Sequence, residues 1–148
     1  MNPDLFRIIE PSSEQEWADY FLLRYKVLRE PWTQPPGSEK DQLEDQCLHA
    51  FLLDENNVGA GVCRLQFNSE TIAQIRYMGI RADLQGLGLG NKLIHYMENK
   101  ALEKGMKRMI LEARENAVNF YGRNGYTISK KSYLMWGEIQ HYTMEKPL

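Results

Sequence analysis

Three glycines on alternate positions are the feature that most constrains this chain. Gly86, Gly88 and Gly90 occur in the segment "RADLQGLGLGNKLIHYMENKALEKG", residues 81–105, directly before a run with helical periodicity. An ordered glycine costs roughly 0.5 to 1 kcal/mol relative to alanine, so three together call for a compensating use. A glycine-rich turn at the start of a helix lets main-chain N–H groups converge beside the positive end of the helix dipole. The segment therefore predicts a phosphate-binding loop.

The spacing of the glycines separates three phosphate-binding patterns. A Walker loop starting at Gly86 needs a glycine at 91 and a hydroxyl at 93, but the chain has Asn91 and Leu93. The dinucleotide pattern GxGxxG needs its third glycine at one of the same two positions. The pattern Gln/Arg-x-x-Gly-x-Gly/Ala is matched in full by Gln85, Gly88 and Gly90. A turn that merely connects a strand to a helix remains the alternative.

Length and composition indicate a single domain over residues 1–148. The chain has 148 residues, 43% of them hydrophobic and 26% charged, and its net charge of -2 argues against a nucleic-acid partner. We find no targeting segment and no apolar run of membrane-spanning length, so we expect a cytoplasmic protein without a membrane partner. Cys47 and Cys63 are expected to be reduced thiols, and we expect no metal site.

The first half of the chain predicts a helix followed by an antiparallel meander. A capping box at Ser13 and Glu16 precedes apolar residues at helical spacing, and Pro31 ends this helix. Residues 33–46 read as a loop or a short helix. Three strands follow at 49–54, 58–67 and 71–80, with turns at 56–57 and 68–70.

The second half predicts a parallel βαβ unit. The helix after the glycines places Leu93, Met97 and Ala101 on one stripe and ends at Gly105, and a short buried strand follows at 107–113. A brief helix at 116–125 has Asn116 as its expected N-cap, and two strands lie near 126–129 and 140–146. The predicted fold is α/β, with a mixed central sheet flanked by helices.

The glycine loop resembles the pyrophosphate loop of the GNAT superfamily of acyl-CoA N-acyltransferases, which implies a GNAT-like fold. The segments "RYMGI" and "NAVNFYGRNGYT" are similar to that family's pantetheine strand and to its short helix after the fifth strand. Within the superfamily the chain resembles the ElaA/YjcF-like bacterial subgroup, which commonly has an Arg where Tyr77 stands. Arg76, one step earlier, is expected on the opposite face. The matches to this subgroup are Arg24, Glu30, Asp41, Glu44, His49, His141 and Met144.

The resemblance implies an N-acetyltransferase that moves an acetyl group from acetyl-CoA directly to a primary amine on a small molecule or peptide. It places a backbone N–H of Met78 or Gly79 on the thioester oxygen and the main chain of Ile80 against pantetheine. Asn116 and Asn119 would face the pantetheine and thiol end. The pyrophosphate would be held by residues 85–91, which are Gln85, Gly86, Leu87, Gly88, Leu89, Gly90 and Asn91.

The catalytic candidates are Tyr121, His49 and His141. The resemblance makes Tyr121 the general acid for the departing thiolate, and either histidine can act as a base near neutral pH. Each also has a structural reading, as a core aromatic residue or a hydrogen-bonded histidine. Glu112 is a further candidate base but is expected to be an exposed, salt-bridging carboxylate.

Several alternatives remain open from the sequence. The protein could be a CoA-binding sensor or partner module without catalysis, and a nucleotide hydrolase is a more distant reading. The acidic run Asp41, Glu44 and Asp45 could attract a cationic amine, or it could simply be solvated. The amine acceptor is unidentified, and a homodimer is one open possibility for the assembly.

Overall fold

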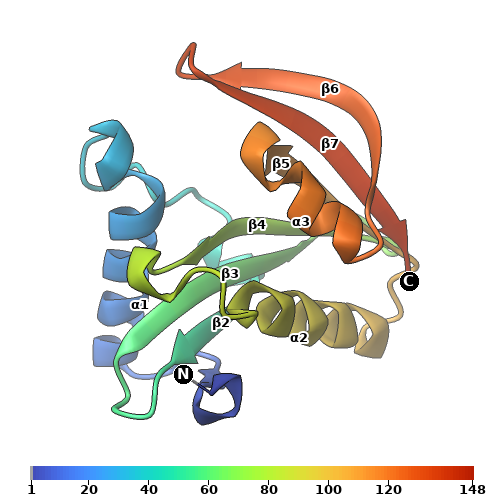
Figure 1. The fold of residues 1–148 in the computed structure, drawn as a ribbon. Helices are drawn as coiled ribbons and strands as arrows, with labels where there is room; N and C mark the ends of the chain where they lie inside the picture. Colours follow the sequence, from blue (N-terminus) through green and yellow to red (C-terminus); the bar gives the residue numbers. More distant parts are fainter. Residues whose placement is uncertain (1) are drawn as a thin grey trace.

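The computed structural model describes residues 2–148, which build one seven-stranded sheet in the order β1-β2-β3-β4-β5-β7-β6 (Figure 1). Neighbouring strands are antiparallel except for the parallel pair β4–β5. This confirms the predicted meander followed by a βαβ unit. The strands are β1 (Arg7–Ile9), β2 (Leu48–Leu53), β3 (Gly59–Phe67), β4 (Ile72–Ile80), β5 (Arg108–Arg114), β6 (Thr127–Met135) and β7 (Ile139–Pro147).

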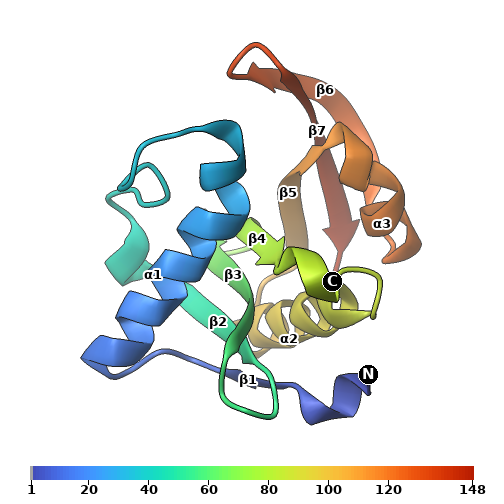
Figure 2. The same ribbon diagram turned by 60° about the vertical axis from the view of Figure 1, so that its left-hand side comes forward.

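Two long helices cover opposite faces of this sheet (Figure 2). Two consecutive residues of β2, whose side chains point to opposite faces, show this: Leu52 packs in the core with α2 (Leu89–Glu103), and Phe51 packs with Tyr20 of α1 (Glu14–Leu28). The short helix α3 (Val118–Arg123) follows β5. No helix among residues 2–148 is long and apolar enough to cross a membrane.

The helix boundaries follow from local chemistry. Ser13 Oγ accepts a hydrogen bond from the Glu16 N–H, and a Glu16 carboxylate oxygen accepts one from the Ser13 N–H, which confirms the capping box. The predicted stripe of α2 is buried, and Gly105 ends the helix with a φ of 79°. This left-handed conformation favours glycine.

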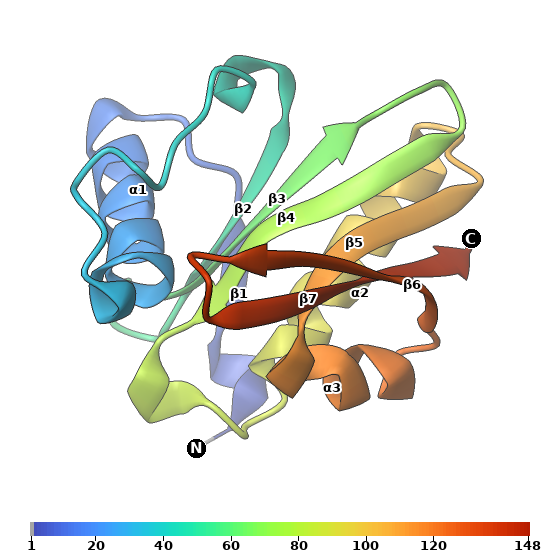
Figure 3. The ribbon, with the colours of Figure 1, turned by 90° about the horizontal axis from the view of Figure 1, so that it is seen from above.

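The parallel pair β4–β5 stays together for only four residue pairs, from Ile72 with Arg108 to Ile75 with Leu111. Beyond that point β4 continues to Ile80 without a partner in β5, and the two strands diverge (Figure 3). The sheet therefore opens at the carboxyl ends of its two parallel strands. Ligands of α/β proteins commonly bind at such an opening.

A β-bulge in β4 lies beside this opening. Val62 of β3 pairs with Gly79 and Arg64 pairs with Arg76, so Tyr77 and Met78 both lie opposite one residue of β3. Tyr77 has a φ of 51°, in the left-handed region. The bulge breaks the alternation of side chains, and the guanidinium carbon of Arg76 lies 5.0 Å from the Tyr77 ring centroid. The predicted placement of these two residues on opposite faces is therefore wrong.

Two other sequence expectations differ from the structure. The three-residue strand β1 was not predicted, because so short a segment shows no periodicity. Asn116 is not the N-cap of α3, since it lies inside a 3-10 helix at Glu115–Ala117 and Ala117 precedes α3 without a side-chain cap.

Gly90 permits close packing of α2 against α3, and we predict that Gly90→Ala destabilises the fold. An added Cβ would lie 2.8 Å from Phe120 Cζ and 3.2 Å from Met78 Cε. Overpacking of this kind costs about 1 to 3 kcal/mol. In α3, Gly122→Ala is the matched control, because its Cβ would meet nothing within 4 Å. In urea unfolding, the free energy of unfolding should fall for Gly90→Ala and rise by about 0.5 to 1 kcal/mol for Gly122→Ala. Equal effects would contradict the packing role of Gly90.

Candidate active site

A groove of about 580 Å³ lies where the sheet opens, between the glycine loop, the end of β4 and α3. Gly86 and Gly88 line it with φ values of 83° and 80°, and a Cβ would have nothing within 4 Å at Gly86 and only Asn91 Nδ2, at 4.0 Å, at Gly88. Gly88 is the N-cap of α2 and has no side-chain cap. The first main-chain N–H groups of the helix therefore remain available for an anion.

The groove brings together most of the residues that the sequence assigned to the cofactor. Leu87 and Asn119 are the exceptions: Leu87 packs against the hydrophobic core, and Asn119 is exposed outside the groove. The Gln85 amide donates a hydrogen bond of 3.3 Å to the Ile80 carbonyl, which ties the loop to β4. The predicted residues that line the groove are Met78, Gly79, Ile80, Gln85, Gly86, Gly88, Leu89, Gly90, Asn91 and Asn116.

Two arginines in the wall of the groove were missed by the sequence analysis. Arg114 ends β5, and Arg123 ends α3, and both line the same groove as the glycine loop. The positive charge of Arg123 complements the helix N-terminus at a site suited to phosphate, whereas Arg114 also lines a neighbouring cavity. Each arginine occurs in a segment that carries no glycine pattern, so spacing alone gave no signal for them.

A second cavity, of about 150 Å³, adjoins the groove. The two share Leu28, Met78, Arg114, Ala117 and Tyr121 as lining residues. The second cavity extends from this shared wall towards the hairpin of β6 and β7. A ligand in the groove and a second molecule in the cavity would thus meet at the shared residues. We call the smaller space the acceptor cavity.

Tyr121 lies at the junction of the groove and the acceptor cavity. Its hydroxyl is 3.6 Å from Met78 Sδ, to which it donates a weak hydrogen bond. Burial raises the pKa of this phenol above its usual value. The hydroxyl is therefore protonated at neutral pH and can act as a proton donor.

His141 lines the acceptor cavity from β7. Its Nδ1 lies 3.0 Å from the Ile139 carbonyl oxygen, which can only accept, so Nδ1 carries the proton and Nε2 of the neutral ring holds a lone pair. Burial lowers the pKa of His141 below its usual value. The ring stacks on Tyr133 at a centroid distance of 4.4 Å. His141 is thus oriented and neutral, as a base requires.

Glu112 also lines the acceptor cavity, although the sequence favoured an exposed carboxylate in a salt bridge. The side chain is half-buried, and it accepts hydrogen bonds of 2.9 and 3.0 Å from the Thr143 hydroxyl. This correction follows from the register of β5 and β7, which places Glu112 opposite Thr143.

His49 lines neither the groove nor the acceptor cavity. Its Nε2–H donates to the Glu44 carbonyl at 2.8 Å, and its Nδ1 lies 2.8 Å from the Tyr20 hydroxyl. Burial lowers the pKa of this histidine. With both ring nitrogens engaged inside the fold, His49 has the structural role that was its alternative reading.

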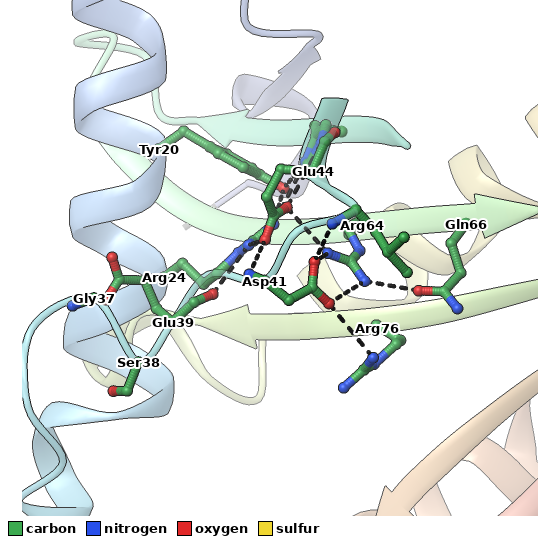
Figure 4. Close-up of polar contacts among 12 residues, drawn as sticks. Tyr20, Arg24, Gly37, Ser38, Glu39, Asp41, Glu44, Arg64, Gln66 and Arg76 are labelled. Carbon is green, nitrogen blue, oxygen red and sulfur yellow. Dashed lines mark hydrogen bonds and ion pairs between the residues drawn. The ribbon is translucent and has the colours of Figure 1, made fainter. Parts of the chain in front are cut away.

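His49 belongs to a buried polar network around Arg24 and Arg64 (Figure 4). Glu44 lies 2.8 Å from Arg24 Nη1 and 3.1 Å from Arg64 Nη1. Asp41 forms a bidentate pair with Arg64, at 2.7 and 3.0 Å. The Arg64 hydrogen bonds hold the pKa of Asp41 at about 2. Both arginine side chains are completely buried, so their carboxylate partners are needed to neutralise them.

The acidic run of the sequence is therefore mostly used inside the protein. Asp41 and Glu44 pair with buried arginines, and only Asp45 is exposed. Neither Asp41 nor Glu44 lines the acceptor cavity. The idea that this run attracts a cationic amine loses its basis, because the two paired charges are already compensated.

We predict that Glu44→Gln destabilises the protein by about 3 kcal/mol, because it leaves two buried guanidinium groups with one carboxylate. Burial raises the pKa of Glu44, but the hydrogen bond and charge of Arg24 outweigh this effect and lower it overall. The contribution of Glu44 is therefore complete above its unfolded pKa of about 4.3 and declines as the pH falls. Urea unfolding at several pH values should show that the difference in the free energy of unfolding between the parent and Glu44→Gln becomes smaller as the pH falls. The exposed Asp45→Asn is the control, and equal stability of both variants at pH 7 would contradict the role of Glu44.

Acyl-CoA N-acyltransferases are the class of protein with this fold and loop. The chain belongs to the Acetyltransferase (GNAT) family, whose model matches residues 7–126. It is 29% identical over 136 residues to the uncharacterized N-acetyltransferase YjcF of Bacillus subtilis, covering 90% of this chain and 94% of that one. Two solved structures share the fold. A protein from Lactobacillus plantarum assigned as an N-acetyltransferase has a TM-score of 0.86, 24% identity and coverage of 97% and 98%. A GNAT family acetyltransferase from Elizabethkingia anophelis with acetyl-CoA bound has a TM-score of 0.73, 15% identity and coverage of 98% and 99%.

Proposed function

We propose that the protein transfers an acetyl group from acetyl-CoA directly to a primary amine, without a covalent enzyme intermediate. The observation that carries this proposal is the junction of the groove and the acceptor cavity at Met78 and Tyr121. A donor and an acceptor bound in these two spaces would have their reacting ends side by side, and such proximity removes much of the entropic barrier.

The groove suits the diphosphate of CoA. Gly86 and Gly88 leave a cradle that a Cβ would otherwise occupy, and the uncapped N-terminus of α2 faces it. Arg123 adds a positive charge to the wall. When bound there, acetyl-CoA supplies the acetyl group as a reactive thioester. The bound acetyl-CoA of the Elizabethkingia relative supports the assignment.

The residues at the junction have separate tasks in this proposal. A main-chain N–H of Met78 or Gly79, beside the bulge and beyond the point where β4 and β5 separate, polarises the thioester carbonyl oxygen. His141 Nε2 accepts a proton from the amine in the acceptor cavity. Tyr121 donates its hydroxyl proton to the departing sulfur. The binding roles of Asn116 and Asn119 also remain proposals.

The direct test follows free thiol release from acetyl-CoA with a broad panel of primary amines. Release that depends on an amine, with an N-acetylated product identified by mass spectrometry, supports the proposal. Tight acetyl-CoA binding without product from any amine would instead favour a CoA-binding sensor or partner module.

We predict that Gly88→Glu abolishes binding of acetyl-CoA, because the new side chain would enter the diphosphate cradle with a negative charge. A ligand at 100 times its dissociation constant stabilises the folded state by about 2.7 kcal/mol. Acetyl-CoA should therefore raise the melting temperature of the parent but not of this variant, and NAD should raise neither.

Gly105→Glu is the control for this experiment. Gly105 follows the other end of α2 and has almost the same φ, 79° against 80°. Both substitutions thus carry the same backbone strain, about 1 to 2 kcal/mol, and the same charge. An acetyl-CoA shift that survives in Gly88→Glu, or a larger shift with NAD in the parent, would refute the assignment of the loop.

We predict that Tyr121→Phe lowers kcat by about 100-fold, the lower end of the range for a positioned acid, because the raised pKa makes the phenol a weak donor. Substrate affinity should change little, since the ring remains. Tyr126→Phe is the matched control: its hydroxyl donates to Glu98 at 2.8 Å in the core, and the residue lines neither cavity, although its ring packs edge-on against Tyr121. This variant should lose stability but retain kcat. A folded Tyr121→Phe enzyme with parental kcat would remove Tyr121 from the mechanism.

A further inference from the structure

The acceptor cavity is lined by an excess of positive charge. Arg29, Arg76 and Arg114 contribute guanidinium groups to its wall, whereas Glu112 contributes a single carboxylate. His141 is neutral in this environment because burial lowers its pKa. The charged lining therefore favours a negative group on whatever occupies the cavity.

Arg29 is a buried cation whose side-chain hydrogen bonds go to main-chain carbonyl oxygens and whose guanidinium also lies over the Tyr77 and Trp136 rings. Its side chain is 8% exposed, its Nε donates to the Ser38 carbonyl at 3.1 Å, and its Nη1 donates to the Leu28 carbonyl at 3.1 Å. No carboxylate within residues 2–148 forms an ion pair with it. Burial lowers the pKa of Arg29, as expected for a buried cation without a carboxylate partner.

Arg114 is in a similar position beside Arg29, because both guanidinium groups donate to the Leu28 carbonyl oxygen. It has a long hydrogen bond of 3.5 Å to the Leu28 carbonyl, and its guanidinium lies 5.7 Å from the Trp32 ring centroid. Burial lowers the pKa of Arg114, and the charge of Arg29 lowers it further. The two cations thus repel each other, and an anion bound beside them in the cavity that both line would relieve this repulsion.

The buried arginines outside the acceptor cavity, by contrast, have carboxylate partners. Arg24 and Arg64 are neutralised by Glu44 and Asp41 within hydrogen-bond distance. Arg76 is only partly neutralised. Asp41 lies 3.7 Å from it, but this carboxylate already forms a bidentate pair with Arg64. The protein therefore supplies carboxylates to its interior arginines and leaves the cavity arginines for an external partner.

Resting on the proposed function, we infer that the acceptor is a small free amino acid or related amine whose own carboxylate binds between Arg29 and Arg114. Arginine binds carboxylates with paired, charge-assisted hydrogen bonds, which gives both affinity and orientation. A cavity of about 150 Å³ is smaller than the 300 to 1,000 Å³ typical of drug-sized ligands, so the acceptor has few non-hydrogen atoms. Because Arg114 and Tyr121 both line the wall that the cavity shares with the groove, a carboxylate held by the arginines keeps the amine of a small acceptor near the junction.

The test compares amines that differ only in the carboxylate. Glycine and alanine are each assayed beside the corresponding C-terminal amide, with acetyl-CoA, at one ionic strength and with kcat/KM referred to the concentration of the neutral amine. We expect kcat/KM to be at least tenfold higher for an acid than for its amide. Amides that react as well as the acids would overturn the inference and leave the proposed function intact.

Variants of the lining residues test whether the preference for acids over amides arises in the acceptor cavity. Arg114→Gln should lower the ratio of acid to amide kcat/KM by several-fold, mainly through KM, and Arg76→Gln, which removes a charge from the wall without direct contact with the carboxylate, should lower it less. Arg108→Gln is the control, because Arg108 is exposed at the opposite end of β5 and pairs with Glu145 at 3.9 Å. An unchanged ratio in folded Arg114→Gln and Arg76→Gln enzymes would refute the assignment of the anion site.

A binding measurement on the parental protein keeps the inference testable if no amine in the panel reacts. With CoA present, N-acetylglycine should raise the melting temperature more than N-acetylglycinamide at equal ionic strength. Equal shifts, or none, together with no acid preference in turnover, would overturn the inference. A different result would refute the proposed function: no amine of any class causes release of thiol from acetyl-CoA.

Discussion

The separation of β4 from β5 is the constraint on which the rest of the site depends. The two strands pair only as far as Ile75 and Leu111. The residues that follow in each strand therefore lie beside open space and not beside the other strand. Unpaired main-chain groups are costly when buried, and the groove and acceptor cavity make them accessible to a ligand instead. The bulge at Tyr77 contributes to the same opening, because it interrupts the pairing of β4 on its other side. One local break in the sheet thus creates both the space and the hydrogen-bonding groups of the site.

The buried arginine network fixes the other wall of the opening. Leu28, the last residue of α1, lines both the groove and the acceptor cavity. The helix is held at this place by Arg24, which Glu44 joins to Arg64 of β3. The loop that carries Glu44 therefore acts on the site through the position of α1. Its charges have a structural function, although the loop contributes no residue to either cavity.

Features that depend on short-range patterns were predictable from the sequence. The glycine loop, the capping box at Ser13, the meander and the parallel βαβ unit each have a periodicity or a spacing that one segment contains. The bulge at Tyr77 was not predictable, because it depends on how β3 and β4 pair over distance. The same is true of Arg29 and Arg114, which approach the cavity from different parts of the chain. The sequence did not decide whether His49 is a catalytic base or a structural residue, for a similar reason. Its partners Tyr20 and Glu44 belong to other elements.

The distribution of compensated and uncompensated charge gives the site its chemical character. A buried guanidinium without a carboxylate lowers stability, and a protein retains such a group where it serves binding or catalysis. Around Tyr77, the guanidinium carbons of Arg24 and Arg29 lie 4.4 and 5.5 Å from the ring centroid, so one aromatic side chain separates a neutralised arginine from an unneutralised one. The ring also stabilises both cations through its face. Tyr77 adds no charge of its own beside these cations, so Arg29 and Arg114, which form no ion pair within residues 2–148, dominate the charge of the cavity wall.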